Sequence, residues 1–228
     1  MEVVPQVHWL KAGYANVYLC VEEAGLTLVD SGPPKRAEAI LEYVTGLGRE
    51  ASEIRTILIT HADWDHAGSV AALQARTGAT IVAAPPTAEY LRRGRAPKHM
   101  PWPVSFVVDL IGRYEPAPEA ALTTAPAGTV LPVLGELHVL ATPGHTSDHH
   151  SFYSPDRGVL FAGDALGTRS GKVSIAPDFI TANRTAARRS ARWLLRLSPE
   201  LFACGHGAPL AASSASELDR LQEELGQS

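Results

Sequence analysis

The sequence has few cysteines, no excess of basic residues and no long apolar run, and each of these absences excludes a class of protein. Its two cysteines, Cys20 and Cys204, are too few for a disulfide framework and fit a reducing compartment. A formal net charge of −4 lacks the excess of basic residues that is typical of nucleic-acid-binding domains. No apolar run approaches the ~20 residues of a membrane span, and the N-terminus lacks a signal-peptide pattern. We therefore expect a cytoplasmic protein with neither a nucleic-acid nor a membrane partner.

What is present is the composition of an ordinary globular protein, with 45% hydrophobic and 19% charged residues. Apolar, strand-like runs alternate with amphipathic, helix-like stretches through most of the chain. We expect helices over 33–48, 68–78, 178–197 and 214–227, and strands over 17–23, 26–32, 54–60, 79–85, 137–142, 149–154, 158–164 and 201–205. This alternation predicts an α/β fold.

Residues 86–128 differ from the rest because they are rich in proline and carry mixed charge. We interpret them as an insertion or lid, without a strand of the sheet. No linker, short-period repeat or low-complexity segment divides the chain. The sequence therefore predicts a single domain over 1–228, with 86–128 as a lid or substrate insertion.

Four predicted strands run directly into a residue that can bind a metal ion. The apolar runs before His61, His145, Asp164 and His206 each end within a few residues of that side chain. Strand ends in α/β folds are where loops gather and where sites are usually built. One histidine or aspartate at a strand end is usually structural, but four at separate strand ends predict a shared metal site.

The segment "THADWDH", residues 60–66, contains four residues that can bind a metal ion. It presents His61, Asp63, Asp65 and His66 straight after a buried strand. Buried ionisable groups are costly unless they are paired or bind a metal. By itself the Asp65–His66 pair could equally cap the helix that follows.

Five stretches together resemble the metallo-β-lactamase superfamily: "NVYLCVEEAGLTLVDSG", with Asn16 and Asp30, then "THADWDHAGS", "TPGHTSDHHSFY", "LFAGDAL" and "ACGHG". They occur in order between about residues 14 and 210, and they are specific as an ordered set. The resemblance implies a four-layer αβ/βα sandwich with a two-metal site along one edge of the paired sheets.

The resemblance also implies which side chains bind the ions. It gives the first metal His61, Asp63 and His145, gives the second Asp65, His66 and His206, and makes Asp164 the bridge. A hydroxide held between two ions would then attack an ester, thioester, amide or phosphoester. Asp65 would in addition steer a proton to the leaving group, and Asp30 would orient a ligand histidine. His149 matches a second histidine of the third motif and is expected beside the site, not as a ligand.

Asp63 departs from the usual H-x-H-x-D-H pattern of the superfamily, because this chain reads H-A-D-W-D-H. Two divalent ions with Asp63, Asp65 and Asp164 would leave a net charge of +1, where a histidine at this position would leave +2. An oxygen ligand in place of imidazole also favours harder ions. We expect two divalent ions, zinc first, with iron or manganese as alternatives.

Three functions follow from this pattern. The first is a metal-dependent hydrolase of ester-type bonds (lactone, thioester, carboxylic or phosphoric ester) in a small molecule. The second is a di-iron redox protein, because the flavo-diiron branch of the superfamily carries a carboxylate at this position. The third is a non-catalytic metal-binding relative. A single ion at the second position, with Asp63 uninvolved, is a further alternative.

Two features bear on the substrate. Trp102, Phe106 and Tyr114 of the expected lid could supply apolar walls. Arginines at fourfold spacing, namely Arg184, Arg188, Arg192 and Arg196 with Arg189 beside them, form either a solvated face or a site for an anionic substrate. The sequence leaves a homodimer open.

Overall fold

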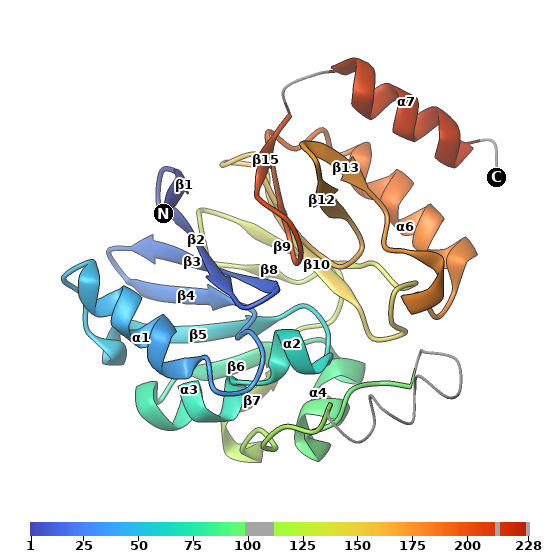
Figure 1. Ribbon diagram of the computed structural model, residues 1–228. Helices are drawn as coiled ribbons and strands as arrows, with labels where there is room; N and C mark the ends of the chain where they lie inside the picture. The colour runs from blue at the N-terminus through green and yellow to red at the C-terminus, as the bar shows by residue number, and fades with distance from the viewer. Residues whose placement is uncertain (99–111, 213–214, 227–228) are drawn as a thin grey trace.

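The computed structural model describes residues 1–98, 112–212 and 215–226, and two β-sheets form its centre (Figure 1). The first sheet is seven-stranded and runs β1 to β7 in order. Its strands are β1 Glu2–Val4, β2 Val7–Ala12, β3 Ala15–Glu22, β4 Gly25–Val29, β5 Ile54–Ile59, β6 Thr80–Ala83 and β7 Leu122–Thr124. The strands expected over 17–23 and 26–32 are confirmed as β3 and β4, which pair antiparallel as a hairpin with Glu22 opposite Gly25.

The second sheet has six strands in the order β15-β14-β11-β10-β9-β8. They are β8 Val130–Leu131, β9 Leu137–Ala141, β10 His150–Ser154, β11 Val159–Gly163, β14 Leu201–Cys204 and β15 Leu210–Ala211. A separate hairpin, β12 Gly167–Arg169 and β13 Lys172–Ser174, follows β11. Strands β11 and β14 are parallel neighbours, so the residues after them emerge at the same edge.

Helices cover the outer face of each sheet. On the first sheet lie α1 Ala37–Gly46, α3 Val70–Thr77 and α4 Pro85–Arg93, with the short α2 Trp64–Ala67 at its edge. On the second lie α6 Arg184–Leu195 and α7 Ala215–Gly226. Short 3₁₀ turns occupy Ala51–Glu53, Glu119–Ala121 and Asp178–Ile180. None of the helices in the described part of the chain combines the length and apolar character needed to cross a bilayer.

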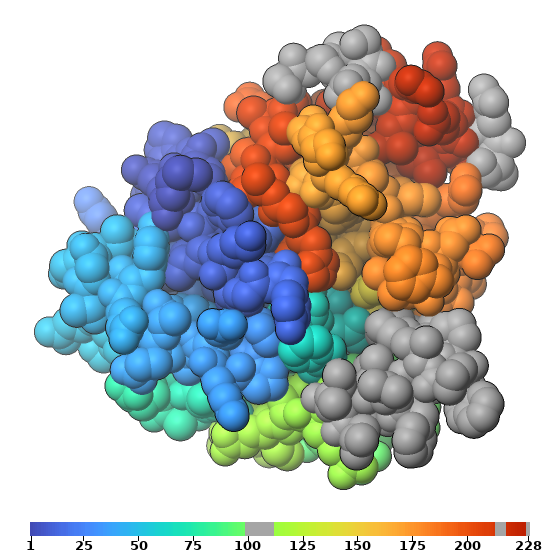
Figure 2. All heavy atoms as spheres, in the orientation of Figure 1, coloured from blue at the N-terminus to red at the C-terminus, as the bar shows by residue number. Residues whose placement is uncertain are grey.

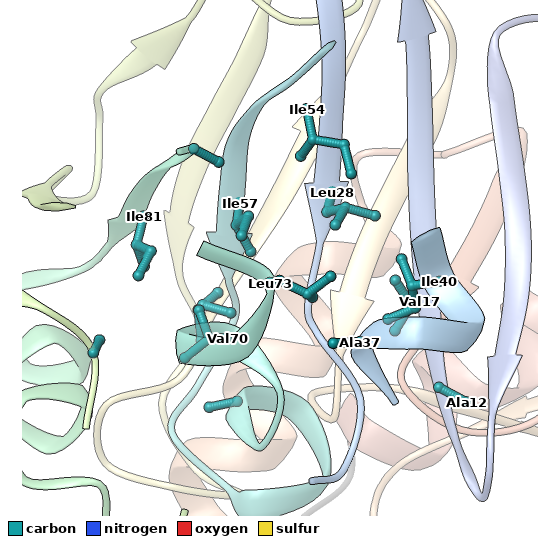
Figure 3. Packing of buried hydrophobic residues seen from close by; sticks show 14 of the residues in the cluster. Ala12, Val17, Leu28, Ala37, Ile40, Ile54, Ile57, Val70, Leu73 and Ile81 are labelled. Carbon is teal, nitrogen blue, oxygen red and sulfur yellow. The ribbon is translucent and has the colours of Figure 1, made fainter. Parts of the chain in front are cut away.

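Successive side chains along a strand point to opposite faces of its sheet, and the apolar ones form three layers. In β5, Ile57 and Ile59 face the helices, whereas Leu58 faces the second sheet. Figure 3 shows the helix-side layer, where Ile40 of α1 lies beside Val17, and Leu73 of α3 lies close to Leu28 and Ile57. The corresponding layer under α6 and α7 includes Leu160, Ala162, Leu194 and Phe202. Helix, sheet, sheet and helix thus stack in four layers, which confirms the predicted αβ/βα sandwich.

Two sequence-based expectations were wrong. Part of 86–128 belongs to the first sheet, because β7 pairs parallel with β6. This edge strand could not be recognised from its sequence, "LTT", because only Leu122 carries an apolar side chain into the core. The long helix begins at Arg184, not at 178, because Asn183 caps it by accepting a hydrogen bond from the Ala186 N–H. Trp102 and Phe106 lie outside the described residues, so the lid remains a prediction.

Candidate metal centre

The four strand-end motifs meet where the two sheets are joined by backbone hydrogen bonds. The His150 N–H donates to the Thr60 carbonyl, and the Asn16 N–H donates to the Gly205 carbonyl, each at 2.8 Å. In Figure 2 teal atoms from the first half of the chain lie between the blue N-terminal strands and the orange C-terminal half. Residues from both halves of the sequence therefore line one site.

One group of metal-capable atoms comes from His61, His145 and Asp164, all buried, within 4.8 Å of one another. Asp63 adjoins them, with its Oδ2 3.3 Å from His145 Nε2 and 3.6 Å from His61 Nε2. Asp63 occupies the N-cap position of α2, which begins at Trp64. The structure therefore brings all four side chains of the predicted first site together.

The second group is Asp65, His66 and His206, again within 4.8 Å of one another. Asp164 of the first group also adjoins the second, with Oδ1 3.3 Å from His66 Nε2 and Oδ2 3.2 Å from His206 Nε2. The same Oδ2 lies 3.5 Å from His145 Nε2 in the first group. Asp164 thus lies between the two groups, as a bridging ligand would.

The chemistry of these side chains fits divalent ions. His61 Nε2 and His66 Nε2 are buried and make no hydrogen bond within the described part of the chain, although carboxylate oxygens of Asp63 and Asp164 lie 3.6 and 3.3 Å from them. A buried polar atom without a partner costs ~1–3 kcal/mol, so such atoms in native proteins call for an explanation. Imidazole nitrogens combined with carboxylate oxygens suit zinc, iron and manganese.

In His66 and His206 the other ring nitrogen, Nδ1, makes a hydrogen bond that turns Nε2 toward the cluster. His66 Nδ1 lies 2.8 Å from Asp30 Oδ2, and His206 Nδ1 lies 2.9 Å from the Tyr14 carbonyl. Asp30 also accepts hydrogen bonds from the Thr60 N–H and hydroxyl. Asp30 has left-handed backbone, with φ of +63°, which aspartate tolerates better than most residues. Outer contacts of this kind fix the orientation of ligand histidines.

His149 lies beside the cluster but has both ring nitrogens engaged. Its Nε2 accepts a hydrogen bond of 2.9 Å from the Asp164 N–H, and its Nδ1 lies 2.8 Å from the Thr142 hydroxyl. Burial lowers the pKa of His149 well below its usual value, so the ring is neutral. It therefore positions the Asp164 backbone and offers no nitrogen to a metal ion.

The carboxylates of the cluster favour positive charge on the histidines beside them. Burial lowers the pKa of His206, but the Asp164 carboxylate outweighs this effect and raises the pKa to about 9. Burial raises the pKa of Asp164, yet His66 and His206 hold that pKa well below its usual range. Because a cation is favoured at these positions, the site suits metal ions electrostatically.

Gly205 gives the cluster the space it needs. A Cβ at this position would overlap Asp164 Oδ1 and lie 2.6 Å from His66 Cε1. The loop that carries His206 is in turn fixed by Asn16, whose Nδ2 donates to the carbonyls of Cys204 and Gly207 at 2.9 Å and 2.6 Å. Cys204 itself is buried and packs in the helix-side layer of the second sheet.

Sequence reasoning missed two features of the site. Asp148 is fully buried and bonds to the backbone between His61 and Asp63. Its signal was present, as a carboxylate three residues after His145. A cavity of about 720 Å³ adjoins the cluster and is lined by residues that follow Asp164, which no sequence motif indicated. The predicted wall residue Tyr114 is buried instead, and its hydroxyl donates to the Ala62 carbonyl.

The arginine series of α6 is only partly a solvated face. Arg184 lies 3.3 Å from Asp178, and the Arg192 guanidinium donates to the Leu225 carbonyl of α7. Arg192 therefore joins two helices on the side of the second sheet away from the first.

A two-sheet sandwich with histidines and aspartates gathered from four strand ends defines a metal-binding α/β protein. The sequence profile described as the Metallo-beta-lactamase superfamily matches residues 10–206. The chain belongs to this superfamily.

Several known proteins are similar to the chain. Uncharacterized protein YobT of Bacillus subtilis (strain 168) is 30% identical over 91% of this chain and 89% of its own length. Probable metallo-hydrolase YflN of the same organism is 27% identical over 98% of this chain and 92% of its own length. Hydroxyacylglutathione hydrolase of Idiomarina loihiensis (strain ATCC BAA-735 / DSM 15497 / L2-TR) is 31% identical over 71% of this chain but only 51% of its own length.

Solved structures share the fold. A metallo-beta-lactamase family protein from Thermus thermophilus superposes with a TM-score of 0.77 at 24% identity, over 99% of this chain and 81% of that one. A B3 metallo-beta-lactamase described as the first with an active-site glutamic acid gives a TM-score of 0.74 at 26% identity, over 99% and 88%.

Proposed function

We propose that this protein is a binuclear metal-dependent hydrolase that cleaves an ester-type bond in a small molecule. The observation that carries the proposal is Asp164, whose two oxygens adjoin histidines of both ligand groups. His61, Asp63 and His145 would hold one ion, Asp65, His66 and His206 would hold the second, and Asp164 would contact both. Paired divalent ions lower the pKa of water, polarise the oxygen of the scissile bond and stabilise the leaving group.

The remaining residues orient groups and move protons. Asp30 holds the His66 ring through Nδ1, so that Nε2 faces the cluster. Asp65 is only partly buried and lies 3.5 Å from His206 Nε2, at the more open side of the site. A carboxylate in this position can hold a proton and pass it to the departing group.

The bond type draws support from the relatives. YflN is named a probable metallo-hydrolase, and the hydroxyacylglutathione hydrolases are named for hydrolysis of a thioester. The chain spans about half the length of the latter, so their substrate does not transfer directly. Lactones, thioesters and carboxylic or phosphoric esters of small molecules are therefore the compounds to test.

Asp63 favours a second candidate, a di-iron redox protein, because a carboxylate at this position suits harder ions than zinc. The similar B3 metallo-beta-lactamase described as having an active-site glutamic acid supports hydrolysis, since an enzyme of the same fold also has an acidic side chain in its active site. We therefore rank the hydrolase first, and zinc before iron or manganese.

The experiment is metal analysis of protein purified without chelator or added zinc, followed by turnover of an ester, thioester, lactone and phosphoester panel. We expect two divalent ions per chain and metal-dependent turnover of at least one class. Asp164→Ala should abolish turnover, whereas Asp156→Ala, at an exposed turn, should not. Stoichiometric iron with oxygen consumption would replace the hydrolase by the redox protein. Stable metal binding without any turnover would indicate a non-catalytic relative.

A further inference from the structure

The cavity of about 720 Å³ begins at the metal cluster, since Asp164 and His206 are part of its lining. The rest of the lining comes from the segment after Asp164 and is largely apolar: Leu166, Val173, Ile175, Ala176, Pro177 and Ile180. Its volume lies within the ~300–1,000 Å³ typical of ligand pockets. An apolar group placed there would leave the reacting bond at the metal ions.

The wall of this cavity is fixed relative to the cluster. The Thr168 N–H at the start of the β12–β13 hairpin donates to the carbonyl of His206 at 3.1 Å. Val173 and Ile175 pack against the apolar layer beneath α6 and α7. The hairpin is therefore anchored at both sides, and its three-residue strands give a wall about 10 Å long.

The turn of the hairpin is positively charged. Arg169 lies opposite Lys172 at the turn, whereas Gly167 lies opposite Ser174 at the end nearer His206. Both cations line the cavity, and Asp164 of the cluster is the carboxylate among the described lining residues. The end of the cavity away from the metal ions thus favours negative charge.

We propose that this cavity binds the acyl group of the substrate, an apolar chain of about the hairpin's length, and that Arg169 favours a chain with an anionic end. The inference rests on the proposed function, because it takes the cleaved bond to lie at the cluster. Binding of the acyl group is nevertheless measurable without turnover.

The first test compares butyrate with octanoate by calorimetry on the metal-loaded protein. Both carboxylates can reach the metal ions equally, so their difference reports on the cavity. Each buried methylene should tighten binding by about fourfold. Ala176→Phe, which fills the cavity, should remove this gain, whereas Ala127→Phe at a distant exposed turn should preserve it. Equal binding of the two acids, or no effect of Ala176→Phe, would overturn the proposal.

The second test compares suberate with 8-aminooctanoate, which have similar length and opposite charge at the far end. Suberate should bind more tightly, and Arg169→Gln should reduce the ratio by about threefold, the size expected for an ion pair at the exposed Arg169. Arg157→Gln, on an exposed loop, serves as the control. A ratio unchanged by Arg169→Gln would remove the anionic end from the proposal.

The two proposals can fail separately. Octanoate binding that depends on residue 176, without turnover of any ester, would refute the hydrolase and leave the cavity assignment intact. Turnover that changes neither with acyl chain length nor with Ala176→Phe would refute the cavity assignment and leave the hydrolase proposal intact.

Discussion

The buried Asp148 carboxylate accepts a hydrogen bond of 3.0 Å from the Ala62 N–H, which joins the second strand-end motif, at His145, to the first, at His61. Ala62 lies between His61 and Asp63, and its carbonyl accepts a hydrogen bond of 3.0 Å from the Tyr114 hydroxyl. Both backbone polar groups of Ala62 are therefore fixed. The spacing of the two neighbouring candidate ligands, His61 and Asp63, depends on that restraint.

Replacing Asp148 should thus loosen the first metal position. We expect Asp148→Ala to lower the free energy of unfolding by ~1–3 kcal/mol, because the buried Ala62 N–H loses its partner. It should also reduce metal occupancy at the first position more than at the second, measured by stepwise metal titration. Asp156→Ala is the matched control on the surface. Equal weakening of both positions would mean that Asp148 acts on overall stability alone.

Gly205→Ala tests the close packing around Asp164. The added methyl group would overlap Asp164 Oδ1 and approach His66 Cε1. We expect loss of at least one bound ion and a lower melting temperature, by metal analysis and calorimetry. Gly46→Ala at the end of α1, where a Cβ meets nothing within 4 Å, should be neutral or slightly stabilising. Normal metal content in Gly205→Ala would contradict the packing seen here.

Asp30→Asn should weaken the second metal position. The amide retains the shape of the side chain and tolerates left-handed backbone, but it loses the charge that holds His66 Nδ1. We expect metal affinity to fall by about 10–100-fold, the usual effect of removing such an outer contact. Competition with a chromophoric chelator measures this change. An unchanged affinity would show that the negative charge of Asp30 is not needed to orient the His66 ring.

Asp63→His should change which metal is bound. The substitution exchanges a carboxylate oxygen for an imidazole nitrogen and adds one positive charge to the loaded site. We expect the ratio of zinc to manganese or iron, bound in competition, to rise relative to the unaltered protein. Asp156→His controls for a histidine elsewhere on the surface. No change in metal preference would mean that Asp63 is not a ligand.

Removal of the metal ions should destabilise the whole domain, because the cluster joins both sheets. Ions that bind only the folded state stabilise it by RT ln(1 + [L]/Kd), ~4 kcal/mol when the ion is present at a thousand times its Kd. Thermal unfolding before and after dialysis against chelator, and again after zinc is restored, measures the effect. An unchanged melting temperature on chelation would contradict structural coupling of the cluster to the fold.

The order of residues along the chain was enough to predict an α/β fold and the strand ends at which the metal-capable residues lie, and the resemblance to the superfamily implied the four layers. Apolar periodicity is local, so β3, β4, β5 and β11 could be predicted without knowledge of their neighbours. The ordered motifs could be recognised in the same way, and with them the candidates His61, His66, Asp164 and His206.

Contacts between distant parts of the chain account for the rest. The edge strand β7 forms because β6 offers free backbone groups, which its own residues do not reveal. Asp148 has its role only because Ala62, 86 positions away, points its N–H at it. The cavity exists only where the β12–β13 hairpin meets the cluster. A pattern along the chain records which side chains are available, whereas packing decides which of them meet.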